Sequence, residues 1–198
     1  MTEQDNAPKD IPSKAEPSAR EMQVLDAAFK TFTRYGFARS TMDDIATEAG
    51  LSRPALYLHF RNKKDIYRAY TTKMTDAMMD GLTHYLALDG TPDAVLWQAL
   101  DNCLITPMRT IVATEHGHEL MNLKNDMAAD IMDAMLVRER ALFAGFYQRH
   151  GQDAAGALRI AYLTMDALEG AKSRMTSIEA FAASARSITG LVAKLLKA

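Results

Sequence analysis

The sequence predicts an all-α protein with a small three-helix head at its N-terminus and a larger helical body. Three observations predict this class: apolar residues recur at spacings of three and four, no segment shows sustained period-two alternation, and Gly, Pro and capping residues divide the helical stretches. With 198 residues, of which 48% are hydrophobic and 24% charged, both parts can bury a core. We expect a disordered, proline-punctuated arm over 1–17, a head over 18–65 and a body over 66–198.

The first helix of the head is expected over 19–35. Its apolar residues, including Val24 and Phe32, fall on one face, and Gly36 supplies the left-handed residue that ends a helix. A second helix starts at Ser40 or Thr41, because either hydroxyl can cap it, and it ends at 49–50.

A short third helix follows the capping residue Ser52, with Pro54 tolerated in its first turn. A long fourth helix is expected from Lys63 to about Leu88. Further helices fill the chain beyond 89–92, separated at Pro107, Gly117, 150–151 and 176–177.

Residues 42–60 have the spacing of a helix-turn-helix. Gly50 provides the turn, where a positive φ costs glycine nothing, and Ala46 leaves room for the second helix to approach. The apolar positions that join the two helices are Ile45, Ala49, Leu51 and Leu56. A chance helical hairpin is the alternative for this segment taken alone.

The residues around this motif carry a resemblance that extends from Val24 to Lys63 without a gap. They read Val24-Leu25-Asp26-Ala27-Ala28, Tyr35-Gly36-Phe37, Thr41-Met42-Asp43-Asp44-Ile45-Ala46, Ala49-Gly50-Leu51-Ser52 and Leu56-Tyr57-Leu58-His59-Phe60, followed by Lys63. This signature resembles the TetR/AcrR family of tetracycline-repressor-like transcriptional regulators. The rest of the chain is similar to that family only in length and helical character.

The resemblance implies that the third helix enters the major groove of a double-stranded operator. The residues implied to face the base pairs or the groove rim are Ser52, Arg53, Ala55 and His59. Those implied to contact phosphates are Thr41, Tyr57, Lys63 and Lys64. Tyr57 as a packing residue, His59 as a solvated rim residue and Lys64 on a merely solvated helix face remain alternatives. Many relatives have small residues where this chain has Arg53-Pro54, so the operator sequence is not predicted.

The charge distribution agrees with a local phosphate contact. The net charge is −2, yet the segment from Arg53 to Arg68 holds five basic residues and only one acidic residue, Asp65. A basic patch on an otherwise acidic chain favours local contact with a nucleic acid and argues against a general polycation.

The last two helices, expected over 153–173 and 178–197, carry apolar stripes that predict a four-helix interface of a homodimer. A capping box of Thr176 and Glu179 opens the last helix. Packing inside one subunit is the alternative. The residues expected in the dimer interface are Leu158, Tyr162, Met165, Phe181, Ala185, Ile188 and Val192.

Methionine and aromatic residues between head and dimer helices suit an adaptable apolar cavity for a small-molecule effector, apolar or amphipathic in character. This expectation depends mainly on the resemblance, and an ordinary helical core is the alternative. The residues expected to line the pocket are Tyr85, Trp97, Met108, Met121, Met135, Phe143 and Tyr147.

Other functions are disfavoured by the sequence. The single cysteine, Cys103, excludes an intramolecular disulfide, and no stretch is apolar over a membrane-spanning length, so we expect a cytoplasmic protein without a cofactor. His116 and His118 lack a second ligand cluster, which disfavours a metal site, and no catalytic motif appears. The sequence therefore predicts a homodimeric, ligand-released repressor. An activator or a nucleoid-associated regulator of the same fold is the alternative.

Overall fold

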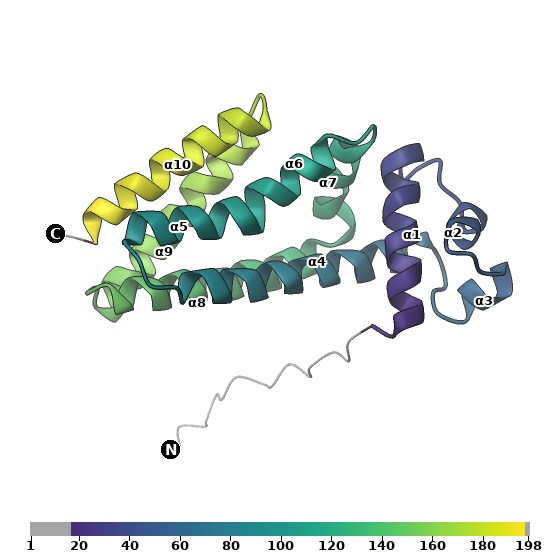
Figure 1. Cartoon of the computed structure of the whole chain (residues 1–198), viewed down its shortest axis with the longest axis horizontal. Helices are drawn as coiled ribbons and strands as arrows, with labels where there is room; N and C mark the ends of the chain where they lie inside the picture. The colour runs from purple at the N-terminus through teal and green to yellow at the C-terminus, as the bar shows by residue number, and fades with distance from the viewer. Residues whose placement is uncertain (1–16, 197–198) are drawn as a thin grey trace, which may run out of the picture.

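A computed structural model describes residues 17–196, with the backbone alone described at 124–126. This part of the chain folds into helices and has no strand, which confirms the predicted all-α class. The head lies at one end of an elongated molecule and the body extends away from it (Figure 1). No helix within 17–196 combines the length and the apolar character needed to cross a membrane. The arm predicted over 1–17 lies outside the described residues, Pro17 excepted.

The head consists of α1 (Ala19–Tyr35), α2 (Met42–Glu48) and α3 (Arg53–Tyr57). Ser18 caps α1 in a reciprocal capping box with Glu21, which satisfies two amides at the start of the helix. The apolar face of α1 packs on the buried residues of the other two helices and closes the head's core. The fully buried members of this core are Val24, Leu25, Ala28, Phe32, Ile45, Leu56 and Ile66.

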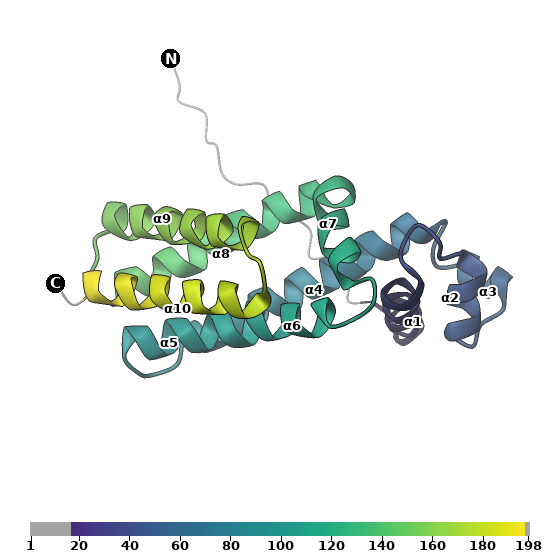
Figure 2. The same cartoon turned by 90° about the horizontal axis from the view of Figure 1, so that it is seen from above.

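A single long helix, α4 (Lys63–Leu86), runs from the head into the body (Figure 2). Its first turns place Ile66 and Tyr67 in the head's core, and its later turns place Met79 and Leu82 in the body's core. The head's core also includes Leu120 of α7, so it extends beyond the boundary expected at residue 65. The two cores are therefore joined through α4 and α7.

The first body segment is one continuous helical run made of α5 (Pro92–Leu100), the π-helical turn η1 (Asp101–Ile105) and α6 (Thr106–Val112). The expected break at Pro107 is wrong. Proline has no amide hydrogen and its ring clashes with the carbonyl four residues earlier. The π-turn widens the helix just before Pro107, with the Thr106 amide bonded to the Asp101 carbonyl five residues back, and the run continues.

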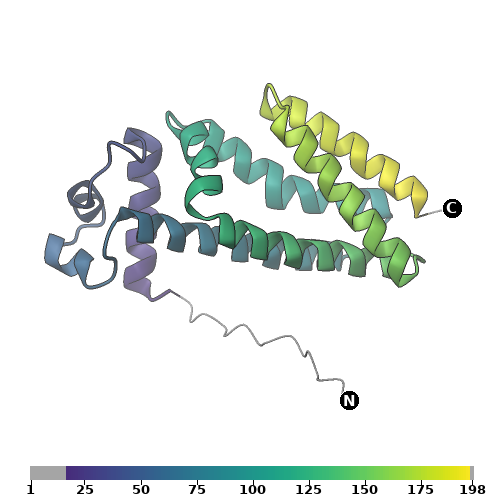
Figure 3. The same ribbon diagram turned by 180° about the vertical axis from the view of Figure 1, so that it is seen from behind.

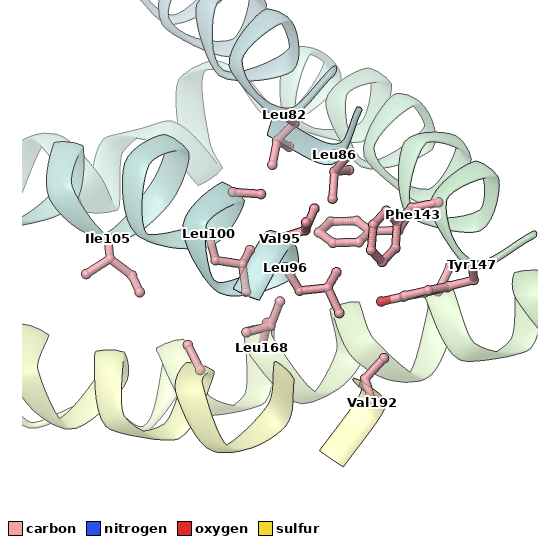
Figure 4. Packing of buried hydrophobic residues seen from close by; sticks show 14 of the residues in the cluster. Leu82, Leu86, Val95, Leu96, Leu100, Ile105, Phe143, Tyr147, Leu168 and Val192 are labelled. Carbon is pink, nitrogen blue, oxygen red and sulfur yellow. The ribbon is translucent and has the colours of Figure 1, made fainter. Parts of the chain in front are cut away.

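The remaining helices are α7 (Gly117–Met127), α8 (Ala129–Arg149), α9 (Ala154–Ser173) and α10 (Ile178–Leu195). Seen from behind, α8 lies along α4 while α9 returns across α8 and leads to α10 (Figure 3). The cap of α10 is Ser177, whose side chain accepts a hydrogen bond from the Ala180 amide, rather than the expected Thr176. Side chains from α4, α5, α8, α9 and α10 meet in the body's core (Figure 4).

Candidate nucleic-acid interface

Two capped helices and one glycine build the α2–α3 unit. Thr41 and Asp44 form a capping box, in which the Thr41 amide and hydroxyl both donate to the Asp44 carboxylate, at 2.9 and 2.7 Å. These hydrogen bonds lower the pKa of Asp44 below its usual value. Gly50 turns the chain with a φ of +62°, and Ser52 caps α3 by accepting from the Ala55 amide at 3.3 Å. The local signals in the sequence are sufficient for this geometry.

The short helix α3 turns almost all of its side chains outward. Leu56 is completely buried and anchors the helix in the head's core, whereas Tyr57 is 42% and Leu58 85% exposed. Among the residues predicted to face DNA, Ser52, Arg53 and His59 are exposed and Ala55 is half-buried. The structure thus leaves the outer side of α3 uncovered by any described part of the chain.

The turn before α3 is fixed from α1. The Gln23 side-chain amide donates to the Ala49 carbonyl at 2.7 Å, between α2 and the turn. This long-range hydrogen bond, together with the burial of Ile45 and Leu56, holds the two helices of the motif at a defined angle.

Arg53 is already engaged within the head. Its Nη1 lies 3.0 Å from Oδ2 of Asp43, and the centre of its guanidinium lies 5.6 Å from the ring centroid of Tyr57. Arg53 and Tyr57 were expected to make separate contacts with DNA, and they form one exposed unit with Asp43.

Lys63, which is predicted to contact a phosphate, is surrounded by backbone carbonyls of the α1–α2 loop. Its ammonium donates to the carbonyls of Phe37 at 2.7 Å, Ala38 at 3.0 Å and Ser40 at 2.9 Å, and it lies 4.7 Å from the Phe37 ring centroid. An ammonium has three donors, and these three carbonyls occupy all of them. Lys63 therefore holds the α1–α2 loop in this structure, and its contact with a phosphate stays a prediction.

Lys64 and Arg61 are the exposed cations that the predicted basic patch retains. Neither forms an ion pair with any other described residue. By contrast, Arg68 binds the Asp130 carboxylate with both terminal nitrogens, and this contact lowers the pKa of Asp130 to about 2. The patch is smaller than the sequence count suggested, because folding brings acidic partners to its members.

Sequence reasoning missed two cations beside the motif, Arg34 and Arg39. Both are exposed and line an open hollow of about 480 Å³ between the end of α1, the start of α2 and the α6–α7 turn. Arg39 precedes the cap of α2 by two residues, and its position next to a helix N-terminus was the available signal. The remaining lining residues are Tyr35, Asp44, Glu115 and His116.

The α6–α7 turn connects the body to the head at this hollow. The His116 amide donates to the Thr33 carbonyl at 3.1 Å, and the Glu119 carboxylate accepts from the Ala38 amide at 3.3 Å. The His116 ring also lies 3.4 Å from the Glu119 carboxylate at the start of α7. Within the described residues, no group of histidine, cysteine and acidic side chains is arranged to hold a metal ion.

Most of the residues predicted to line an effector pocket lie in the packed core of the body. Phe143 and Tyr147 are completely buried there and Met108 nearly so, while Tyr85, Trp97 and Met135 pack against the same core. Tyr147 has a partner for its hydroxyl in Thr164, at 3.1 Å. Burial also raises the pKa of the half-buried Cys103 thiol to about 11.

Met121 is the predicted pocket residue that does line a cavity. This cavity, of about 30 Å³, lies between α1, α4, α6 and α7, where head and body meet. The Phe29 and Tyr70 rings stack at 5.0 Å in its wall, and the buried Thr71 hydroxyl has no hydrogen-bond partner among the described residues. The other lining residues are Phe32, Tyr67, Met74, Ile111 and Leu120.

The residues predicted for a dimer interface divide into two groups. Leu158 and Tyr162 of α9 are 47% and 43% exposed. The buried group, which faces the subunit's own interior, is Met165, Phe181, Ala185 and Val192, with Ile188 half-buried. These residues are covered within the subunit, because the stripe on α10 packs on α5 and α9, and their place in a dimer interface stays a prediction. The apolar residues that α9 and α10 expose are Leu158, Tyr162, Leu163, Leu191 and Leu195.

A three-helix head with an uncovered recognition helix, joined by one long helix to an all-helical body, defines the helix-turn-helix class of regulators. The sequence model described as "Bacterial regulatory proteins, tetR family" matches residues 24–70. Residues 24–70 therefore match the N-terminal region of the tetR family.

Comparisons with individual proteins agree. The HTH-type transcriptional regulator SrpR of Pseudomonas putida is 33% identical over 89 residues, which are 43% of this chain and 38% of SrpR. A transcriptional regulator from Cytophaga hutchinsonii has the same fold, with a TM-score of 0.75, 18% identity and coverage of 90% of this chain and 98% of the other. SmeT, the repressor of a Stenotrophomonas maltophilia multidrug efflux pump, matches with a TM-score of 0.63 and 17% identity over 91% of this chain and 90% of SmeT. The chain spans less than two thirds of the length of the first curated relatives it matches.

Proposed function

We propose that this protein is a sequence-specific DNA-binding transcriptional repressor that acts as a homodimer and is released from its operator by a small molecule. The observation that carries the proposal is the outer side of α3. A capped helix anchored by Leu56 alone leaves Ser52, Arg53 and His59 exposed, with no described segment covering them. Such a helix fits the major groove, where an arginine reads guanine through two hydrogen bonds.

Phosphate binding is assigned to exposed groups around α3. Lys64 and Arg61 lie next to the N-terminus of α4, and Arg39 lies next to the N-terminus of α2. Helix N-termini favour anions, so cations and free amides act together there. Thr41 contributes through the end of the helix it caps, and the Tyr57 hydroxyl is exposed for the same purpose.

The DNA-binding proposal is tested by fluorescence anisotropy with a duplex from upstream of the protein's own gene. We expect specific binding that weakens steeply with salt, and an Arg53→Ala variant that loses specific affinity while binding random duplex about as before. Equal binding of wild-type protein to upstream and random DNA would contradict the proposal.

The dimer is proposed to form on the exposed apolar face of α9 and α10. Leu191 is 63% exposed and Leu195 56% exposed on α10, one turn apart, beside Leu158 and Tyr162 of α9. A second copy would bury this face and place two heads on two half-sites. In sedimentation experiments we expect Leu191→Glu to be monomeric and to bind the operator weakly. Val137→Glu, at a 65% exposed position on α8, serves as the matched control and should remain dimeric.

The effector is proposed to enter the cavity between head and body. Its aromatic and thioether walls suit an apolar molecule, and the unpartnered Thr71 hydroxyl suits one polar group on it. Because Phe29 and Phe32 of α1 form part of the wall, a ligand larger than the present space must displace α1 and with it the head. A SmeT–triclosan complex shares this fold, so triclosan is a suitable first probe. We expect it to release DNA from wild-type protein at lower concentration than from Thr71→Val.

A further inference from the structure

Asp43 is an acidic residue at the centre of the surface assigned to DNA. It lies in the first turn of α2, and its carboxylate contacts Arg53, the first residue of α3, at 3.0 Å. Both side chains remain largely exposed, Arg53 at 61% and Asp43 at 59%. A carboxylate in this position repels phosphates unless a cation neutralises it.

The contact leaves Arg53 able to read a base. A guanidinium carries five donors, and Asp43 receives a hydrogen bond from Nη1 alone. The Tyr57 ring lies against the guanidinium, which limits the directions it can take. Nε and Nη2 remain for the two acceptors of a guanine edge, O6 and N7. The Asp43 carboxylate therefore holds one edge of the Arg53 guanidinium and the Tyr57 ring covers one of its faces, while the edge formed by Nε and Nη2 stays available for a base.

We propose that Asp43 is a specificity-determining residue that acts through Arg53. It holds the guanidinium in the orientation that reads guanine, and it keeps the same positive charge from binding phosphates at other sequences. Asp43 itself reads no base, so its role is one of positioning. This inference rests on the proposed DNA-binding function.

The test is an Asp43→Asn variant of the full chain, selected in parallel with wild-type protein from duplexes with a randomised central segment. At the one half-site position where Arg53→Ala loses its base preference, we expect Asp43→Asn to lose guanine preference by roughly tenfold. Binding to random duplex should strengthen, because the freed Arg53 now contacts a phosphate. The slope of log K against log salt concentration should become steeper by about one.

Glu48→Gln is the matched control. It removes the same charge from the same helix, but Glu48 pairs with Lys30 of α1, at 3.6 Å, and forms no ion pair with Arg53. We expect Glu48→Gln to keep the wild-type base preference at every position. In the double variant Asp43→Asn/Arg53→Ala, the loss at the guanine position should equal that of Arg53→Ala alone, since Asp43 acts only through Arg53.

The outcomes separate the inference from the function on which it rests. Retained guanine preference in Asp43→Asn, or an equal loss of preference at all positions as from a distorted head, would overturn the role of Asp43 alone. Wild-type protein that selects no sequence from the library would overturn the proposed function and this role together. Thermal unfolding of Asp43→Asn near the wild-type temperature establishes that the head is folded in the comparison.

Discussion

In the head, polar side chains determine the positions of the functional elements, whereas in the body apolar packing does so and several polar groups lack partners. Lys63 satisfies three carbonyls of the α1–α2 loop, and Gln23 fixes the turn before α3. In the body, Glu139 is 9% exposed and makes no hydrogen bond with another described residue, and the Arg140 Nε and Thr71 hydroxyl are buried and unpartnered among the described residues.

This difference teaches how the two parts divide the work proposed for them. A reader of base pairs needs side chains held in fixed positions, which directional hydrogen bonds provide. A body that responds to a ligand needs an interior that can change its packing, and unsatisfied polar groups lower the cost of such a change. The comparison predicts that substitutions in the two parts will fail in different ways.

The largest effect is expected from removing packing in the body. Phe143→Ala empties a completely buried position in the body's core. We expect the free energy of unfolding to fall by about 3–5 kcal/mol, measured by chemical denaturation. Val137→Ala, on the exposed side of the same helix, should change it by less than about 0.5 kcal/mol. A small effect of Phe143→Ala would mean that packing does not determine the body's stability.

The next largest effect is expected from removing the hydrogen bonds between Lys63 and the α1–α2 loop. Lys63→Ala leaves three loop carbonyls without their charged donor, so we expect the free energy of unfolding to fall by about 2–3 kcal/mol. Operator binding should weaken while its salt dependence changes little, because Lys63 positions the loop.

Lys64→Ala is the control beside it. Lys64 is exposed and unpaired with other described residues, so the free energy of unfolding should be unchanged. The slope of log K for operator binding against log salt concentration should fall in magnitude by about one. If the two variants exchange these behaviours, Lys63 is the phosphate ligand that the resemblance implied.

The head was predictable in detail because its signals are local. Thr41, Ser52, Gly36 and Gly50 each determine the backbone within three residues of themselves, and all lie at the helix ends that the sequence indicates. The acceptors of Lys63 lie more than twenty residues away, so no spacing in the sequence could reveal them. Asp43, the partner of Arg53, is closer in the sequence, but the Gly50 turn between the two helices decides that their side chains meet.

The body was predictable as helices but not as surfaces. An apolar stripe shows that a helix buries one face, and it does not say whether its own subunit or a second copy covers that face. In the sequence, the spacing of Phe181 and Val192 is therefore the same as that of residues in a dimer interface, although α5 and α9 cover them within the subunit. Likewise, methionine and aromatic residues mark both filled cores and cavities, and the packing around Met121 leaves a cavity.

The smallest effect, and the most specific to the body, is the dependence of the free energy of unfolding on pH that we expect from Glu139. Burial raises the pKa of its carboxyl from 4.5 to about 7, with Lys172 and Arg140 partly opposing this and Glu169 adding to it. Because the folded protein holds the Glu139 proton more tightly than the unfolded chain, this proton stabilises the fold. The contribution is fully present below pH 4.5, the pKa in the unfolded chain, and is lost as the pH rises through about 7, the pKa in the folded protein.

We therefore expect Glu139→Gln to match wild-type stability at pH 5 and to exceed it by roughly 1–3 kcal/mol at pH 8, in urea unfolding at both values. Asp166→Asn, at an exposed position of α9, is the control and should shift stability by a few tenths of a kcal/mol at either pH. Equal stability of Glu139→Gln and wild type at pH 8 would show that the carboxylate finds a partner when it ionises. In that case the body would satisfy its polar groups as fully as the head does, and the contrast between the two parts would no longer hold.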